Sequence, residues 1–345
     1  MITASQSDTH LQLGPFQGIT DVYFRQEYHS FFTGIDRTFT PFFSGIHTEN
    51  SRNLRGPEID PALNPTETLC PQLLSNDGEE VVRFASQCAA FGYKEVNLNM
   101  GCPYPQVALK KRGSGLMPYV EKVALMAETL RNETGLKLSI KCRLGYYENT
   151  EIDRLLPIFN SLNLTELIIH ARLGKQMYAG TPDKMKFAQL VPKINCPVVY
   201  NGDIFSWEDF KENQRLFPQI NRWMLGRGLL ADPFLAADIK QQCSLEASER
   251  KEQVYRFVTS LYLRRRKAKN DNPAILGRMK ELWSYLHLSF SEPAEAWRSV
   301  RRSRSFDEYE EAVANIFRNQ QWIGKGFRGE SDPDSYKTEP STKIF

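Results

Sequence analysis

The sequence predicts a (β/α)8 TIM barrel over residues 1–242, followed by a small all-α helical domain over residues 243–322. The barrel is indicated by eight short β-rich runs that alternate with amphipathic stretches. They occupy roughly 240 residues, which is the size of this fold. After about residue 243 the pattern changes to helical runs with no strand between them. Residues 323–345 are polar and rich in turn formers, which predicts a flexible tail.

The predicted strands share an apolar, β-rich composition. They lie at 11–15, 36–42, 69–74, 95–100, 137–143, 166–172, 197–202 and 222–227. Two of the connecting stretches, 79–92 and 120–135, have the pattern of amphipathic helices and end in glycine, a common helix terminator. In the second domain we predict helices at 250–268, 272–290 and 305–317.

A doubly wound open sheet is the alternative to the barrel. Polar or charged residues end six different predicted strands: Gln72, Asn99, Lys141, His170, Asn201 and Arg227. In a barrel these ends converge on one mouth, whereas in an open sheet they spread along an edge. We therefore favour the barrel.

The composition predicts a soluble cytoplasmic protein. Of its 345 residues 41% are hydrophobic and 25% charged, and no apolar run approaches the ~20 residues of a membrane span. The polar start, MITASQSDTH, lacks the features of a secretory signal. Six cysteines spaced singly predict reduced thiols, with neither a disulfide frame nor a metal site. No pattern bears on the oligomeric state, and a monomer is favoured.

Basic residues are concentrated in two runs of the predicted helical domain, although the net charge is only +3. These runs are RRRKAK (264–269) and RSVRRSR (298–304). Taken alone, such a run is more often a solvated helix face than a binding surface. The alternative is an anionic partner such as nucleic acid.

Cys102 lies in a Gly-Cys-Pro turn directly after the fourth predicted strand, which places it at the barrel mouth. A cysteine there can act as a nucleophile if its pKa is lowered, or as a proton donor if it stays a thiol. The alternative is a buried structural cysteine, which suits the other five. The turn favours a chemical role for Cys102.

Three basic residues on neighbouring strand ends indicate an anionic ligand. Lys141 ends one strand, and His170 and Arg172 share a face of the next because they are two residues apart. The segments 201–203 (NGD) and 225–228 (LGRG) end the last two predicted strands. Barrel phosphate sites are commonly built from these two loops, so we predict a phosphate-bearing cofactor.

These residues belong to ordered motifs through which the chain resembles the tRNA-dihydrouridine synthases, flavin enzymes with an FMN-binding barrel and a helical domain. The resemblance covers roughly residues 11–320. Its motifs are GPFQGITDVYFR (14–25), PQL (71–73), NMGCPYPQVALKKRGSGLM (99–117), KCRLGY (141–146), HARLGKQMYAGTPD (170–183), NGDI (201–204) and GRG (226–228). Any one motif is weak, but the ordered set is highly specific.

The resemblance implies an FMN-dependent oxidoreductase that reduces a uridine of tRNA to 5,6-dihydrouridine. Hydride would pass from reduced FMN to C6 of the uracil ring while Cys102 protonates C5, and NADPH would reduce the flavin. By the same resemblance Lys141 would lie at the flavin edge that gains negative charge on reduction. Gln72 would hydrogen-bond the flavin ring, and Pro15 and Phe16 would wall it.

The remaining site residues are also assigned by the resemblance. Asn99, His170 and Arg172 would orient the flavin and the uracil, with His170 counted toward the cofactor and the other two toward the substrate. The FMN tail and phosphate would be held by Asn201, Gly202, Asp203, Gly226 and Arg227. A uridine in folded tRNA must be extruded to reach the mouth. The helical domain would bind tRNA phosphates, with Arg264, Arg265 and Arg266 as candidate contacts.

Two alternatives remain open at this point. One is an FMN-dependent reductase of a free pyrimidine or another small activated alkene, and the other is a tRNA-binding protein without catalysis. The chain also departs from the family pattern, with Phe16 in place of methionine, TPFFSG (40–45) at the end of the second strand, and Tyr146 in place of tryptophan. None of these removes a residue that the chemistry requires. The uridine position and the choice between NADPH and NADH are not predicted.

Overall fold

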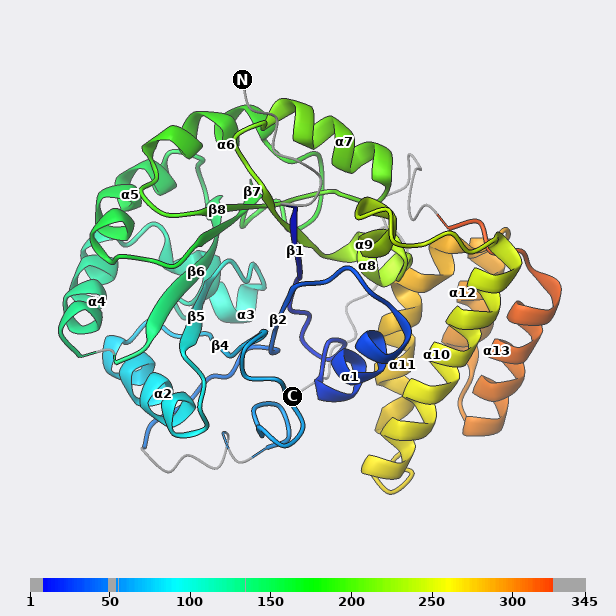
Figure 1. Ribbon diagram of the computed structural model, residues 1–345. Helices are drawn as coiled ribbons and strands as arrows, with labels where there is room; N and C mark the ends of the chain where they lie inside the picture. Colours follow the sequence, from blue (N-terminus) through cyan, green and yellow to red (C-terminus); the bar gives the residue numbers. More distant parts are fainter. Residues whose placement is uncertain (1–8, 49–53, 55, 134, 325–345) are drawn as a thin grey trace.

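A computed structural model describes residues 9–48, 54, 56–133 and 135–324 (Figure 1). It confirms the predicted architecture, a parallel barrel surrounded by helices with a helical region at its C-terminal side. Residues 325–345, nearly all of the predicted flexible tail, lie outside the described part. Among the described residues, no helix is long and apolar enough to cross a membrane.

Nine strand segments form one sheet in which every pairing is parallel, in the order β3-β2-β1-β9-β8-β7-β6-β5-β4. They are β1 (His10–Leu13), β2 (Arg37–Phe39), β3 (Leu69–Cys70), β4 (Gln72–Leu73), β5 (Glu95–Met100), β6 (Lys137–Gly145), β7 (Leu167–Leu173), β8 (Val198–Asn201) and β9 (Arg222–Leu225). Each predicted strand corresponds to one of these, except that the third is in two pieces.

Proline divides the predicted third strand. Pro71 has no N–H to donate, so the ladder is interrupted there. The segment before it, β3, pairs with β2, and the segment after it, β4, pairs with β5. The Pro71 carbonyl still accepts a hydrogen bond from the Asn97 amide at 2.8 Å. The chain therefore passes from one neighbour to the other and closes the barrel at this residue.

Helices surround the barrel, most of them between one strand and the next and the last two after the final strand. They are α1 (Val22–Phe31), α2 (Gly78–Ala90), α3 (Pro105–Ala108), α4 (Val120–Glu133), α5 (Glu151–Ser161), α6 (Lys184–Leu190), α7 (Trp207–Leu216), α8 (Arg227–Ala231) and α9 (Leu235–Ile239). The predicted helices 79–92 and 120–135 correspond to α2 and α4. Asp77 caps α2, because its side chain accepts a hydrogen bond from the Glu79 amide.

Four helices form the C-terminal region: α10 (Ala247–Ala268), α11 (Ala274–Leu286), α12 (Pro293–Arg302) and α13 (Phe306–Asn319). We predict three of them from the sequence. The missed helix, α12, buries only Ala296 and Val300, so its apolar pattern is too sparse to recognise. Phe257 of α10 packs edge-on against Phe24 and Phe32, which joins this region to α1 of the barrel.

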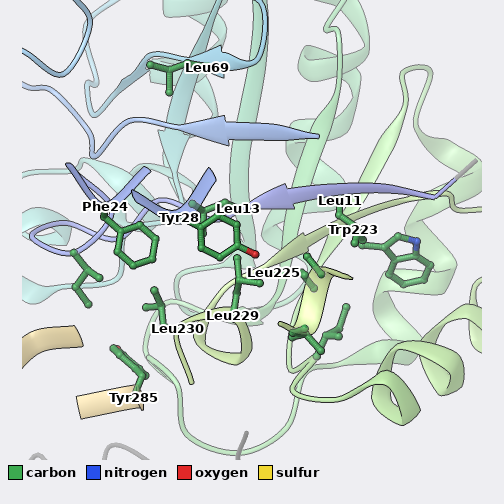
Figure 2. Packing of buried hydrophobic residues seen from close by; sticks show 14 of the residues in the cluster. Leu11, Leu13, Phe24, Tyr28, Leu69, Trp223, Leu225, Leu229, Leu230 and Tyr285 are labelled. Atoms are coloured by element: carbon green, nitrogen blue, oxygen red, sulfur yellow. The ribbon is translucent and has the colours of Figure 1, made fainter. Parts of the chain in front are cut away.

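The hydrophobic core has two parts. The larger part lies between the strands and the helices, and Figure 2 shows its portion where Phe24 and Tyr28 pack near Leu13, Leu230 and Tyr285. The smaller part fills the middle of the barrel interior. It consists of Phe39, Cys70, Ile168, Val199 and Met224. Polar and charged side chains occupy the interior on either side of this apolar layer.

Candidate active site

The residues predicted at the strand ends converge on one mouth, the C-terminal end of the barrel. In the sheet register Asn99 lies beside Lys141, and His170 lies between Arg143 and Asn201. Nine of the ten predicted cofactor residues line a single cleft there: Pro15, Phe16, Lys141, His170, Asn201, Gly202, Asp203, Gly226 and Arg227. The tenth, Gln72, is buried beside the cleft.

The Cys102 turn is held by hydrogen bonds from two directions. The Asn99 side-chain oxygen accepts bonds from the amides of Gly101, at 3.0 Å, and of Cys102, at 2.9 Å. The Cys102 carbonyl accepts from both the amide and the hydroxyl of Ser114, each at 3.0 Å. Gly113 has φ +57°, and a Cβ there would lie 2.5 Å from the Cys102 carbonyl oxygen. The thiol is therefore presented by a rigid backbone.

Burial keeps Cys102 in its protonated form. Only 9% of the residue is exposed, and this desolvation raises the pKa of its thiol. A hydrogen bond from the Tyr104 backbone and the charges of Arg143 and Lys141 oppose the shift without cancelling it. At neutral pH the group is a thiol, so it can donate a proton and is a poor nucleophile.

A chain of amides fixes Asn99 behind the turn. The Asn99 side chain donates to Gln72 Oε1 at 2.8 Å, and Gln72 Nε2 donates to Asn97 Oδ1 at 2.8 Å. Asn97 in turn donates to the Ser139 hydroxyl at 2.9 Å. Both polar atoms of the Gln72 amide are thus engaged within the protein. Asn97 and Ser139 are members of the site that we did not predict from the sequence.

Lys141 extends into the cleft and donates from Nζ to Asn201 Oδ1 at 3.0 Å. Asn201 is itself oriented by a bond from its side-chain nitrogen to the Met224 carbonyl. Burial, followed by the charge of Arg143, lowers the pKa of Lys141 to about 8. The ammonium group is still mostly protonated at neutral pH, but no carboxylate of the described residues pairs with it.

His170 is neutral. Burial lowers the pKa of its imidazole well below the ordinary value, and the charges of Arg143, Lys141, Arg172 and Arg227 lower it further. Its Nε2 lies 3.3 Å from Arg172 Nη1. A guanidinium group can only donate, so Nε2 accepts and the ring proton is on Nδ1.

Asp203 joins the two arginines of the cleft. Its carboxylate accepts from Arg172 at 2.8 and 2.6 Å and from Arg227 at 2.8 Å. Burial by itself raises the pKa of Asp203, but the hydrogen bonds and charges of these arginines outweigh it and hold the pKa below its ordinary value. The carboxylate stays ionised and fixes both guanidinium groups at the edge of the cleft.

Two further residues of the site were missed in the sequence. Arg143 is 1% exposed and donates to the carbonyls of Gly101, Leu173 and Met177, which ties the Cys102 turn to the loop after β7. Its spacing of two from Lys141 places both on one strand face, a signal that could have found it. The ring of Tyr178 contacts the guanidinium groups of both Arg143 and Arg227, but its loop has no periodic pattern.

The arginine run of α10 does not behave as one surface. Arg265 is 2% exposed and donates to the Ile19 carbonyl and to Asp21, so it holds α10 on the barrel and cannot contact a ligand at the surface. Arg264 pairs with the buried Glu27, and Arg266 pairs with Asp271 and Glu310. None of the three lines the cleft.

The cleft carries an excess of positive charge beside a protonated thiol. Lys141 and Arg227 line the cleft as cations, and Asp203 lines it as a carboxylate. Two further cations lie next to it: Arg172, which pairs with Asp203, and Arg143, whose guanidinium group contacts the Tyr178 ring of the lining. Such a site attracts an anion, and in a barrel the loops after the last two strands are the usual place for a phosphate. Fold and site together define a TIM-barrel protein whose C-terminal mouth places cationic side chains next to a protonated thiol.

The chain belongs to the dihydrouridine synthase family, whose model matches residues 12–321, so the resemblance found in the sequence is confirmed. A relative from Neisseria meningitidis serogroup B, named tRNA-dihydrouridine(16) synthase, is 26% identical over 90% of this chain and 95% of its own length. One of the same name from Ralstonia nicotianae is 25% identical over 89% of this chain and 97% of its own. A Staphylococcus aureus protein named probable tRNA-dihydrouridine synthase is 30% identical over 64% of this chain and 69% of its own length.

Two solved structures are similar to this chain at low sequence identity. Morphinone reductase in complex with tetrahydroNAD has a TM-score of 0.47 and 9% identity over 69% of this chain and 88% of its own. N-(5'-phosphoribosyl)anthranilate isomerase from Pyrococcus furiosus has a TM-score of 0.41 and 13% identity over 68% of this chain and 98% of its own. Neither likeness bears on the function of this chain.

Proposed function

We propose that this protein reduces a uridine of tRNA to 5,6-dihydrouridine with FMN as cofactor and NADPH as reductant. The observation that carries the proposal is the protonated thiol of Cys102, held in a rigid turn at a mouth with excess positive charge. Membership of the dihydrouridine synthase family supports the reaction, and the names of the relatives support tRNA as the substrate.

The residues of the cleft fit FMN by their chemistry. A phosphate group suits the last two strand ends, where Gly202, Gly226 and Arg227 combine small residues with a guanidinium group. Pro15 and Phe16 would wall the ring, and Lys141 and His170 would face its polar edge. When bound and reduced, FMN supplies the hydride. Lys141 is suited to stabilise negative charge, because its ammonium group is bonded to the neutral Asn201 side chain and to no carboxylate in the described part of the chain.

The protein's own contribution is a proton and the placement of the base. Cys102 Sγ would give its proton to C5 of the uracil and be left as a thiolate, which takes up a proton from solvent before the next turnover. Arg143 and Lys141 lie near enough to lower the pKa of this thiol, so they would stabilise the thiolate as it forms. Asn99 positions Cys102 through the two backbone bonds, and we assign it and Arg172 to orienting the base.

The barrel ends at residue 242 and the helical region begins at residue 243 in this proposal. The helical region binds the phosphates of tRNA. The run 298–304 is the better candidate surface, since Arg301, Arg302 and Arg304 are exposed and line a cleft with Lys280. Arg264 and Arg266 remain secondary candidates, because both are already paired with carboxylates. A tRNA substrate and six unpaired cysteines also fit a reducing, cytoplasmic setting.

We further propose position 16 of tRNA as the target. The two relatives that match about nine tenths of this chain and nearly their whole length both carry that position in their names.

The test uses the full chain loaded with FMN, given NADPH and unmodified tRNA. We expect dihydrouridine in the tRNA, mapped by mass spectrometry to position 16. Dihydrouridine at another position would contradict only the assignment of the position. Reduction of free uridine but not of tRNA would replace the proposal with the small-molecule reductase, and tRNA binding without any reduction would replace it with the non-catalytic protein.

A further inference from the structure

The rim of the mouth next to Cys102 carries exposed tyrosines. Tyr104 follows β5, Tyr119 precedes α4 and Tyr147 follows β6, with exposed fractions of 51%, 38% and 53%. Aromatic side chains usually bury their faces in the core, as most of those in this protein do. Three exposed tyrosines around one opening are therefore a feature of the surface that needs an explanation.

Two of these rings are paired with lysines. Lys111 Nζ lies 4.2 Å from the centre of the Tyr119 ring, and Lys175 Nζ lies 4.4 Å from that of Tyr147. Both lysines are exposed. Each pair presents an aromatic surface and a positive charge at the same place, a combination suited to a base and its phosphate.

The loops that carry these residues form one continuous rim around the thiol. The amide of Gly174 donates to the Gly145 carbonyl, and that of Lys175 donates to the Tyr146 carbonyl, which joins the loops after β6 and β7. A Cβ on Gly174 would lie 2.3 Å from the Tyr146 ring and 2.6 Å from the Ser114 hydroxyl. That hydroxyl holds the Cys102 carbonyl, and Tyr104 is two residues beyond Cys102.

We propose that this tyrosine rim, made of Tyr104, Tyr119 and Tyr147 with Lys111 and Lys175, stacks the RNA bases that flank the extruded uridine. The proposal rests on the proposed function. Extruding a base leaves its neighbours without a stacking partner, which is unfavourable. Stacking on an aromatic side chain offsets this loss and tolerates any base.

The charge of the rim agrees with a polyanion rather than a protein partner. Lys110, Lys111 and Lys175 are exposed there, while Glu148 is an exposed carboxylate in the loop after β6. The tyrosines of the rim would contact base faces, whereas its lysines and the helical region would contact phosphates. Tyrosine and lysine variants should therefore differ in how salt affects their binding of tRNA.

The experiment measures the affinity of the FMN-loaded full chain for unmodified tRNA at several salt concentrations. Changing Tyr147→Leu or Tyr104→Leu keeps apolar volume but removes the ring, and each should weaken binding by about 5-fold or more with an unchanged salt slope. Tyr147→Phe and Tyr104→Phe keep the ring and should restore the affinity. Lys175→Ala should lower the salt slope by about 1, whereas Lys137→Ala, exposed at the opposite end of β6, should not.

Leucine variants that bind tRNA as tightly as the wild type would overturn the proposal, and so would phenylalanine variants that bind as weakly as the leucine ones. Both comparisons use a wild-type protein that forms dihydrouridine, so neither outcome contradicts the proposed function. A wild type that forms no dihydrouridine in tRNA would overturn the proposed function and, with it, this inference. Thermal melting of each variant shows that the loss is in binding and not in folding.

Discussion

Both ends of the barrel interior contain buried charges, but the charges are balanced only at the N-terminal end. There Glu166, which is fully buried, accepts hydrogen bonds from Gln12 and Arg222 and pairs with Arg37, which also pairs with Glu95. Two arginines thus meet two carboxylates. At the C-terminal mouth the carboxylate of Asp203 pairs with Arg172 and Arg227, and among the described residues no carboxylate pairs with Lys141 or Arg143.

The difference separates stability from function. A balanced buried network can be satisfied within the folded protein, whereas unbalanced buried cations lower its stability until an anion binds. The apolar layer of Phe39, Cys70, Ile168, Val199 and Met224 lies between the two ends. Changes at the N-terminal end should therefore alter folding with little effect on the reaction, and changes at the mouth should do the reverse.

The largest expected effect is at Cys102. Changing Cys102→Ala should reduce dihydrouridine formation by about 10²–10⁴-fold, because it removes the proton donor. FMN binding and the oxidation of NADPH should be retained. Cys142→Ala is the matched control, since this thiol is also buried, on β6, but takes no part in the site. Equal losses in the two variants, measured as product per folded molecule, would contradict the role of Cys102.

At the balanced end, Glu166→Ala should lower the free energy of unfolding by about 3–5 kcal/mol, because Arg37 and Arg222 lose a buried partner. Urea unfolding of the FMN-loaded protein measures the change. Product formation by the molecules that remain folded should match the wild type. A variant with normal stability would show that the N-terminal network does not need its carboxylate.

At the unbalanced end, Lys141→Met should stabilise the ligand-free protein at pH 7. A pKa lowered from 10.5 to about 8 corresponds to about 3 kcal/mol. The lost bond to Asn201 offsets about 1 kcal/mol, which leaves about 2 kcal/mol of stabilisation. Between these two pKa values the unfolded chain holds the proton that the folded protein releases, so wild-type stability rises with pH.

The difference in the free energy of unfolding between Lys141→Met and the wild type should therefore become smaller as the pH rises from about 8 toward about 10. Thermal melting across this range measures it. A stability difference that stays constant with pH would show that burial does not destabilise the ammonium group of Lys141. Dihydrouridine formation by the variant should fall even where its stability is higher.

The smallest expected effect is in the helical region, which shows the same contrast between balanced and unbalanced cations. Arg301→Ala and Arg302→Ala should each weaken tRNA binding by a factor that shrinks at high salt, and each should lower the salt slope by about 1. Both side chains are exposed, unlike Arg265, which is paired with Asp21. Unchanged slopes would remove the run 298–304 from the tRNA surface.

Much of the site could be predicted from the sequence, because the strand ends of a barrel converge on one mouth whatever the details of packing. Lys141, His170 and Asn201 lie together in the cleft for this reason. The same spacing rule would have found Arg143. The hydrogen bonds by which Asn99 and Ser114 hold the Cys102 turn depend on how separate loops pack together. No local sequence pattern indicates that packing.

The arginine run shows the opposite case, in which a local pattern misleads. Arg265 follows Val254, Phe257, Val258 and Leu261 at helical spacing, so it falls on the apolar stripe of α10 that packs on the barrel. Reading the run as a unit hides this. Similarly, the predicted strand 69–74 ignores the missing N–H of Pro71, which divides it into β3 and β4.

The central claim is that Cys102 acts as a proton donor and is therefore a thiol at neutral pH. Its ionisation can be followed by the ultraviolet absorbance of the thiolate, as the difference between the wild type and Cys102→Ser across a pH titration. We predict a pKa of the Cys102 thiol above the ordinary value of 9.0, because burial outweighs the nearby cations. A pKa below that value, with thiolate present at neutral pH, would rule out the proton donor and indicate a nucleophile.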